Sequence, residues 1–280
     1  MVDYQSDGRP SRLWWRVIPI CLGLAIAGYQ YFGAQQFTNP ETGRTARLGL
    51  TDQQEDVLGV QGFREVVSQS HVVTSGPAYD QVLRVSGRLA RVMTGTVHFD
   101  WQVAVVDAPT QNAFCLPGGK ICVYTGILPL TRTDDGLAVV LGHEMAHATC
   151  HHSAERVLHQ NMTQAAMLGV QGSLSDLDYQ QRRTLMGLIG AGAQYGVLLP
   201  FSRAHESEAD LVGLKYMARA GYDPHEAVAF WTRMAKASDG NTQPEFMSTH
   251  PLHETRIRQI EEWLPEVLKE RPGGNLEVER

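Results

Sequence analysis

The chain has 280 residues, of which 43% are hydrophobic and 19% are charged. This composition is enough for a sizeable core but too polar for a protein with many membrane spans. Its 30 acidic residues outnumber the 24 basic ones, and because the bases form no cluster, the charge pattern gives no reason to expect a nucleic-acid partner.

The N-terminal segment predicts a membrane anchor. Residues 17–34 carry no charge, follow three arginines and contain aromatic residues, as single-pass spans do. Because no further basic residue occurs before Arg44, the positive-inside rule places residues 1–16 in the cytoplasm and the rest outside it, which in a bacterium means the inner membrane and the periplasm. The alternative is a signal peptide cleaved at Ala25-Ile26-Ala27, which would release the protein to the periplasm.

Residues 35–75 are polar and contain several glycines. They are expected to form a connector with short helical pieces, such as Gln53 to Leu58. An apolar pattern at helical spacing then predicts a helix from Pro77 to Gly95.

Two runs after this helix predict strands. Val103 to Val106 and Cys122 to Tyr124 are rich in β-branched and aromatic residues, and Gly118-Gly119 supplies the positive φ values that a tight hairpin turn requires. A small antiparallel sheet is therefore expected. With this two-residue turn, Cys115 stands opposite Cys122, so a cross-strand disulfide can form in an oxidising compartment.

The most informative stretch is His143-Glu144-Met145-Ala146-His147. Thr133 and two first-turn acids mark a helix start, and apolar residues repeat at helical spacing to about Val157. Histidines four residues apart lie on one helix face, so both imidazoles can reach one ion. Glu144 can then act as general base on a water at that ion. The pattern predicts a zinc hydrolase, although an ordinary buried helix can also carry so short a motif.

Such a site needs a third protein ligand, whose position separates the classes of zinc peptidase. The metzincin pattern is excluded because Ser153 stands where it requires a histidine. Ser202 to Asp210 begins a later helix that offers a glutamate instead. If Glu206 binds the ion, Asp210 shares its face and can accept a hydrogen bond from a ligating imidazole. The same acids also fit a solvated helix start, so spacing alone leaves both interpretations open.

Three further helices are expected. The first spans Leu177 to Leu199, and its apolar part from Leu185 is expected to pack against the helix that carries the two histidines. The others span Pro224 to Ala237, with proline in the first turn, and Thr255 to Leu268.

Four segments together resemble the gluzincin peptidases, which include the HtpX-like, Oma-type and CAAX prenyl proteases. The resemblance covers roughly residues 75 to 265 in order and spacing. The matching segments are N-A-F-x-x-P-G-G from Asn112, H-E-M-A-H from His143 with H-S-A-E-R from His152, S-R-x-x-E-x-E-A-D from Ser202, and T-H-P from Thr249 with Arg256-Ile257. The resemblance implies an α+β, mainly helical zincin-like domain over residues 76–270, with a small antiparallel sheet beside the active-site helix and a polar tail over residues 271–280.

The resemblance also implies roles for individual residues. One Zn²⁺ per chain would be bound by His143, His147 and Glu206, with Glu144 as the catalytic base. His250 would lie near the metal, where it can donate to a developing oxyanion or, in a resting state, fill the open metal position. These two roles of the histidine stay open.

Further residues are expected around this centre. Asp210 and Arg203 would support the ligands, and for both Arg203 and Arg256 a structural role is favoured over a role in stabilising charge. Zincins bind substrate as an added strand at a sheet edge, which gives affinity without demanding a sequence. The residues expected to line that cleft are Asn112, Ala113 and Phe114.

Together these inferences predict a zinc endopeptidase that acts on polypeptides, with misfolded or damaged envelope and membrane-associated proteins as the substrate class that the resemblance implies. One alternative is a non-catalytic module that uses the zincin cleft to hold unfolded chains, and another is a zinc hydrolase acting on other substrates. The presence of Glu144 favours catalysis, because a binding module has no use for a base beside intact ligands. The likeness to Oma-type proteases also leaves a mitochondrial inner-membrane origin open.

Overall fold

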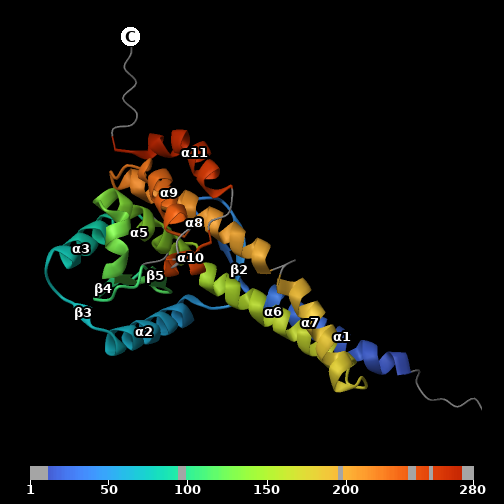
Figure 1. Ribbon diagram of the computed structural model, residues 1–280. Coiled ribbons are helices and arrows are strands. Elements are labelled where there is room, and N and C mark those ends of the chain that lie inside the picture. Colours follow the sequence, from blue (N-terminus) through green and yellow to red (C-terminus); the bar gives the residue numbers. More distant parts are fainter. Residues whose placement is uncertain (1–11, 94–98, 195–197, 239–243, 252–254, 273–280) are drawn as a thin grey trace, which may run out of the picture. The chain divides into compact units, whose positions relative to one another are not determined.

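The structure, a computed structural model, describes residues 12–93, 99–194, 198–238, 244–251 and 255–272 (Figure 1). Most of the predicted cytoplasmic segment and of the predicted tail lies outside these residues. The chain divides into two compact units. Within the described ranges, unit 1 contains residues 12–37, 46–50 and 154–202, and unit 2 contains residues 38–45, 51–153 and 203–272.

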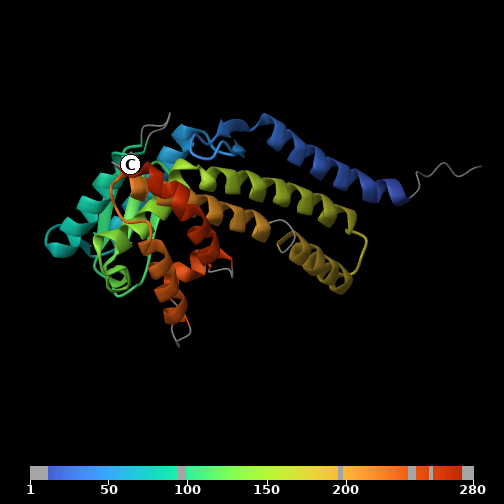
Figure 2. The same ribbon diagram turned by 90° about the horizontal axis from the view of Figure 1, so that it is seen from above.

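Unit 1 is built mainly from helices. These are α1 (Arg12–Gly33), most of α6 (His152–Ser173), α7 (Tyr179–Ala193) and the first residues of α8 (Leu199–Arg219). α1 runs beside α6 (Figure 2), and glycine permits the close approach, because a Cβ added at Gly23 would lie 2.5 Å from the carbonyl oxygen of Ala165. No residue of α7 is buried, so its apolar side chains do not form the core that was expected of this run.

The predicted anchor corresponds to most of α1. Among the helices that the structure describes, none is both long enough and apolar enough to cross a membrane. The helix includes Arg16 and Pro19, and Tyr29, Gln30 and Tyr31 lie in its last turns; these residues lower the hydropathy of a span.

The predicted connector is folded. It contains β1 (Gln35–Thr38), β2 (Thr45–Leu48), α2 (Asp52–Gln69) and β3 (Val72–Val73). β1 and β2 form a two-stranded sheet, and α2 begins with a capping box, in which the Thr51 side chain accepts from the Gln54 backbone and the Gln54 side chain accepts from the Thr51 backbone.

The main sheet of unit 2 has the strand order β3-β4-β6-β5. Its longer strands are β4 (Gln102–Val106), β5 (Ala113–Leu116) and β6 (Lys120–Tyr124). β5 and β6 form the expected hairpin, whose turn contains Gly118 and Gly119 with φ values of 69° and 79°. The sheet is mixed, because β4 runs parallel to β6 while the two outer strands are antiparallel to their neighbours. β5 therefore forms one edge.

The predicted pairing of Cys115 with Cys122 is wrong. Because Leu116 pairs with Lys120, the turn has one more residue than expected and the register moves by one position. Cys115 stands opposite Ile121, and since successive side chains point to opposite faces, Cys122 points to the other face of the sheet. All four cysteines are free.

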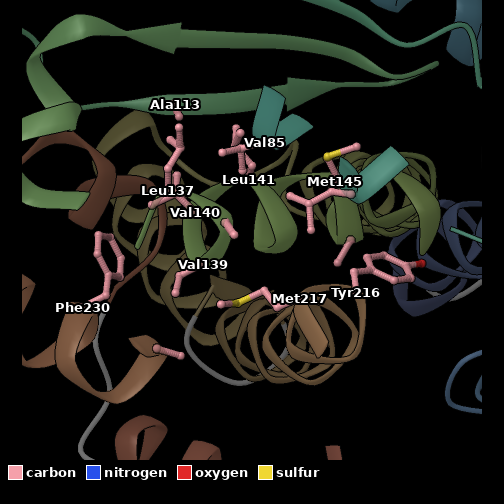
Figure 3. Packing of buried hydrophobic residues seen from close by; sticks show 14 of the residues in the cluster. Val85, Ala113, Leu137, Val139, Val140, Leu141, Met145, Tyr216, Met217 and Phe230 are labelled. Carbon is pink, nitrogen blue, oxygen red and sulfur yellow. The ribbon is translucent and has the colours of Figure 1, made fainter. Parts of the chain in front are cut away.

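The two histidines of the H-E-M-A-H segment lie on α5 (Asp134–Thr149). As predicted, Thr133 caps this helix, because its hydroxyl accepts from the Gly136 backbone N–H at 3.1 Å. Figure 3 shows Leu137 and Leu141 on the side of the sheet, and Val139 on the side of Met217 in α8. The helix also packs against α3 (Pro77–Ala90) and α9 (Glu226–Ser238). α5 thus has apolar contacts on opposite sides, as expected of a buried helix.

The predicted continuous helix to Val157 is in fact two helices. α5 ends at Thr149 with Cys150 as its C-cap, His151 adopts φ 55°, and α6 begins at His152. Left-handed backbone is costly for most residues, and here the buried His151 Nδ1 lies 2.5 Å from Glu55 Oε2 of α2. A contact with a distant part of the chain therefore accompanies the break.

α5 and α8 touch backbone to backbone within unit 2. A Cβ added at Gly213 would lie 2.9 Å from the carbonyl carbon of Gly142 and from the backbone nitrogen of His143. Only glycine at this crossing allows the two helices to lie so close. The remaining elements are η1 (Thr125–Ile127), α4 (Leu128–Thr131), α10 (Glu245–Thr249), α11 (Arg256–Val267) and η3 (Leu268–Glu270).

Candidate metal centre and active site

Four side chains of unit 2 converge on one point. His143 and His147 come from α5, Glu206 from α8, and His250 directly follows α10. Their candidate ligand atoms all lie within 4.8 Å of one another. His143 Nε2 is 3.1 Å from His147 Nε2, 3.1 Å from His250 Nδ1 and 3.3 Å from Glu206 Oε2. The structure thus brings together the three predicted ligands and His250, the histidine predicted to lie near the metal.

This donor set fits a zinc ion. Ligand atoms around a tetrahedral zinc with bonds of about 2.0–2.1 Å lie about 3.3 Å apart, which matches the separations found here. His143 Nδ1 faces Asp210 at 2.9 Å, which leaves its Nε2 to bind an ion. His147 Nε2 lies 3.1 Å from His143 Nε2, so both nitrogens can hold the same ion.

Asp210 and Arg256 support His143 from behind. Arg256 donates to Asp210 Oδ2 from Nε and to Oδ1 from Nη2, both at 2.7 Å. Its side chain is fully buried, and its guanidinium lies 3.5 Å from the ring centroid of Trp231. Asp210 therefore lies where the sequence predicted. Arg203 is exposed, and the described residues show no contact between it and the ligands. The arginine that supports the ligands together with Asp210 is Arg256.

The ligands are strongly coupled electrostatically. Burial would lower the pKa of His143, but hydrogen bonds to Asp210 and Glu206 outweigh it and raise this pKa to about 9. Burial would raise the pKa of Glu206, but hydrogen bonds from His143, His147 and His250 lower it. Burial is also the main reason why the pKa of His147 is well below its usual value. A cation that binds here replaces the proton on His143.

Glu144 lies between the ligands and the sheet edge. Its Oε2 accepts from the backbone N–H of Cys115 at 3.3 Å. Its Oε1 is buried, makes no hydrogen bond within the described residues and lies 3.1 Å from His250 Nε2. Burial raises the pKa of Glu144, and the charges of His250 and His143 offset this only in part. A carboxylate with one free oxygen beside the ligands is equipped to accept a proton.

The predicted cleft residues lie at the start of β5. The side chains of Asn112 and Ala113 are buried, and that of Phe114 is half-buried, so the backbone is the part available to a partner strand. The Asn112 carbonyl accepts from β6. By the alternation of an antiparallel pair, the backbone groups of Ala113 and Cys115 face the free edge, where Cys115 N–H meets Glu144.

One residue next to the ligands had no predicted role. His152 opens the H-S-A-E-R segment, and its Nδ1 lies 2.8 Å from His147 Nδ1. The break after α5 makes this contact, so the expected continuous helix concealed it. The preceding residue, His151, pairs with Glu55 of α2.

Comparison with known proteins places this centre in a family. The profile of peptidase family M48 matches residues 80–264, a range that includes every residue of the centre. The chain belongs to peptidase family M48. The predicted resemblance is therefore confirmed, and so is the fold class, because the chain is mainly helical with a small sheet that contains antiparallel pairs.

The named relatives of this M48 chain are peptidases. It is 36% identical over 275 residues to "Mitochondrial metalloendopeptidase OMA1" of Schizosaccharomyces pombe, which covers 96% of the chain and 77% of that relative. It is 32% identical over 272 residues to "Metalloendopeptidase OMA1, mitochondrial" of Danio rerio, covering 93% and 57%. It is 28% identical over 222 residues to "Beta-barrel assembly-enhancing protease" of Yersinia pestis, covering 78% and 45%. The prediction of a metalloendopeptidase is confirmed.

The predicted location requires correction. The sequence predicted a single-pass protein of a bacterial inner membrane with its peptidase domain in the periplasm. The OMA1 relatives from several organisms are named as mitochondrial, and no helix in the described part of the chain can span a membrane. The apolar N-terminal stretch on which the prediction rested forms most of α1, and one side of this helix packs against α6 inside unit 1.

Proposed function

We propose that this M48 peptidase hydrolyses peptide bonds with one Zn²⁺ held by His143, His147 and Glu206, and with Glu144 as general base. The observation that carries the proposal is the convergence of the ligand atoms within 4.8 Å, with a buried carboxylate oxygen free of hydrogen bonds beside them. Both features are what metal-assisted hydrolysis requires.

The chain's own residues account for the proton transfers. Zinc, when bound, would make water more acidic and polarise the substrate carbonyl. Glu144 takes the proton from the attacking water and then passes it to the leaving amine. Its raised pKa, caused mainly by burial, suits both steps, because a base whose pKa lies nearer neutrality can also release the proton. The Cys115 N–H holds the other carboxylate oxygen and so fixes the direction of the free one.

The substrates that we propose are unfolded or misfolded polypeptides. β5 is an edge strand, and the outward backbone groups of Ala113 and Cys115 border the catalytic carboxylate. A peptide that adds to this edge must be extended, and its affinity comes from backbone hydrogen bonds that any sequence can make. Folded proteins do not offer such a segment, so the geometry favours unfolded chains.

His250 is proposed to hold the site in a resting state. Its Nδ1 lies 3.1 Å from His143 Nε2 and 3.0 Å from Glu206 Oε2, while its Nε2 faces Glu144. It therefore stands where the attacking water would have to be, and it must move for the reaction to begin. His250→Ala is expected to raise basal cleavage, whereas a loss of cleavage with zinc still bound would indicate the oxyanion role instead.

The decisive experiment compares wild type with Glu144→Gln. Cleavage of an unfolded test protein is followed by gel, and bound zinc is measured in both samples. We expect wild type to cleave and Glu144→Gln to be inactive at equal zinc content. The matched control is Glu261→Gln, which changes an exposed carboxylate of α11 and is expected to leave cleavage unchanged.

Other outcomes would contradict the proposal in different ways. Folded wild-type protein that binds no zinc would refute the metal site. Zinc binding without cleavage, also after His250→Ala, would support the non-catalytic binding module. Equal cleavage by wild type and Glu144→Gln would show that the base is another group.

A further inference from the structure

We propose that His152 and Glu208 position the zinc ligand His147, and that a loop from the N-terminal part of the chain completes this support. The inference rests on the proposed metal site, because it concerns one of its ligands. It assigns a role to the H-S-A-E-R segment, which the proposed reaction leaves unused.

The hydrogen bonds around His147 allow one arrangement of protons. When His147 Nε2 binds zinc, its Nδ1 must carry the proton. That proton is donated to His152 Nδ1, 2.8 Å away. His152 then carries its own proton on Nε2, which lies 3.0 Å from Glu208 Oε2. The series runs without conflict from the ligand to a carboxylate, and it fixes both the tautomer and the ring plane of His147.

Glu208 is itself held by three donors from the segment between β1 and β2. Its Oε1 accepts from Asn39 Nδ2 at 2.8 Å and from Thr42 Oγ1 at 2.7 Å, and its Oε2 pairs with Arg44 Nε at 2.7 Å. His152 and Glu208 are both buried. A buried carboxylate is costly unless it is paired and hydrogen-bonded, and this loop supplies both a cation and two neutral donors.

The two histidine ligands of α5 are therefore supported in parallel ways. His143 is backed by Asp210 and then Arg256. His147 is backed by a carboxylate and an arginine too, but with one additional imidazole in between. The first series uses only residues that follow α5 in the chain, whereas the second depends on residues 39–44. Binding of zinc is thereby coupled to docking of this loop.

A second metal site at the same place is disfavoured. Cys150, His152 and Glu208 offer ligand atoms close to one another, but both oxygens of Glu208 already accept from other groups and Arg44 neutralises its charge. Burial is the main cause that raises the pKa of Cys150, so its thiol stays protonated and is a poor ligand. The group is a support for His147 and not a further metal centre.

The test measures zinc affinity of the full-length protein by competition with a chelator of known affinity. His152→Ala is expected to weaken zinc binding by about 10- to 100-fold, as outer hydrogen-bond partners of metal ligands do. His152→Gln, which keeps one acceptor and one donor, is expected to recover part of this loss. Arg44→Met is expected to weaken binding in the same direction without touching a ligand.

The matched control is His151→Asn. His151 is the adjacent buried histidine and also pairs with a buried glutamate, Glu55, and the hydrogen bonds described for His147 are made to His143 and His152. Asparagine tolerates its left-handed backbone. This variant is expected to lose thermal stability and to bind zinc as tightly as wild type, which separates a loss of folding from a loss of ligand support.

The outcomes distinguish this inference from the proposed function. If wild type binds zinc and both His152→Ala and Arg44→Met bind it equally well, the positioning role is wrong while the metal site stands. If His152→Ala does not fold, the zinc affinities of Arg44→Met and His152→Gln, compared with that of His151→Asn, test the positioning role. If folded wild type binds no zinc, the metal site and this inference both fail.

Discussion

Replacing Gly213 by alanine is expected to weaken zinc binding by separating two helices. The added Cβ would lie 2.9 Å from two backbone atoms of α5, whereas ordinary contact begins at 3.4 Å, so α8 must move by about 0.5 Å. Glu206 lies on α8 and both histidine ligands lie on α5. Their separation therefore changes by more than the tolerance of a metal site, which is about 0.2 Å.

The size of this effect follows from the same contact. Overpacking of this kind costs about 1–3 kcal/mol. If most of that cost falls on the zinc-bound state, Kd rises by about 5- to 150-fold, since each 1.4 kcal/mol is about tenfold. Chelator competition measures Kd, and thermal unfolding of the metal-free protein measures the cost to the fold alone.

Gly87→Ala provides the control for this prediction. Gly87 lies in α3 with nothing within 4 Å of an added Cβ, and alanine there is expected to stabilise the helix by up to about 1 kcal/mol without affecting zinc. Equal zinc affinity of Gly213→Ala and Gly87→Ala would refute the argument that the backbone contact between α5 and α8 sets the ligand geometry.

Three other predictions follow from described contacts. Arg256→Met leaves buried Asp210 without its cation, so urea unfolding of the metal-free protein should show a loss of about 3–5 kcal/mol, and a loss below 1 kcal/mol would contradict the role given to this ion pair. A hydrogen bond from Arg84 is the main cause that lowers the folded-state pKa of Asp134. The stability that Asp134 contributes is therefore present above its unfolded pKa of about 3.9 and is lost as pH falls through the folded value. The free energy of unfolding should fall more steeply with acid for wild type than for Asp134→Asn below about pH 5, and parallel curves would refute this argument. Phe230→Ala leaves a cavity at a fully buried position and should lower the free energy of unfolding by about 3–5 kcal/mol in the same urea assay. A change within experimental error would show that neighbouring side chains fill this cavity.

Local signals predicted a large part of this structure. The cap at Thr133 and the glycines of the hairpin turn act over a few residues, and both are found where expected. The family resemblance also selected His143, His147 and Glu206, three side chains that the fold brings together. In each case the deciding information lies in residues close in sequence or in a motif with a fixed chemical purpose.

Contacts between distant segments could not be predicted in this way. The parallel pairing of β4 with β6 and the shift in register at Cys115 depend on how strands meet in space. The left-handed residue His151 breaks a helix that its own neighbours would continue, and its partner Glu55 is far away in the chain. The support by Arg256 likewise depends on burial against Trp231, which periodicity does not reveal.

The burial of α5 on opposite sides has a consequence for the synthesis of the protein. α3 and the sheet, which cover one side, precede this helix in the chain, whereas α8 and α9 on the other side are synthesised later. A nascent chain that ends after α5 leaves apolar residues such as Val139 uncovered and lacks Glu206 altogether. The proposed activity can therefore arise only after most of the chain has left the ribosome. While it is still unfolded and incomplete, the growing chain therefore lacks one of the proposed zinc ligands.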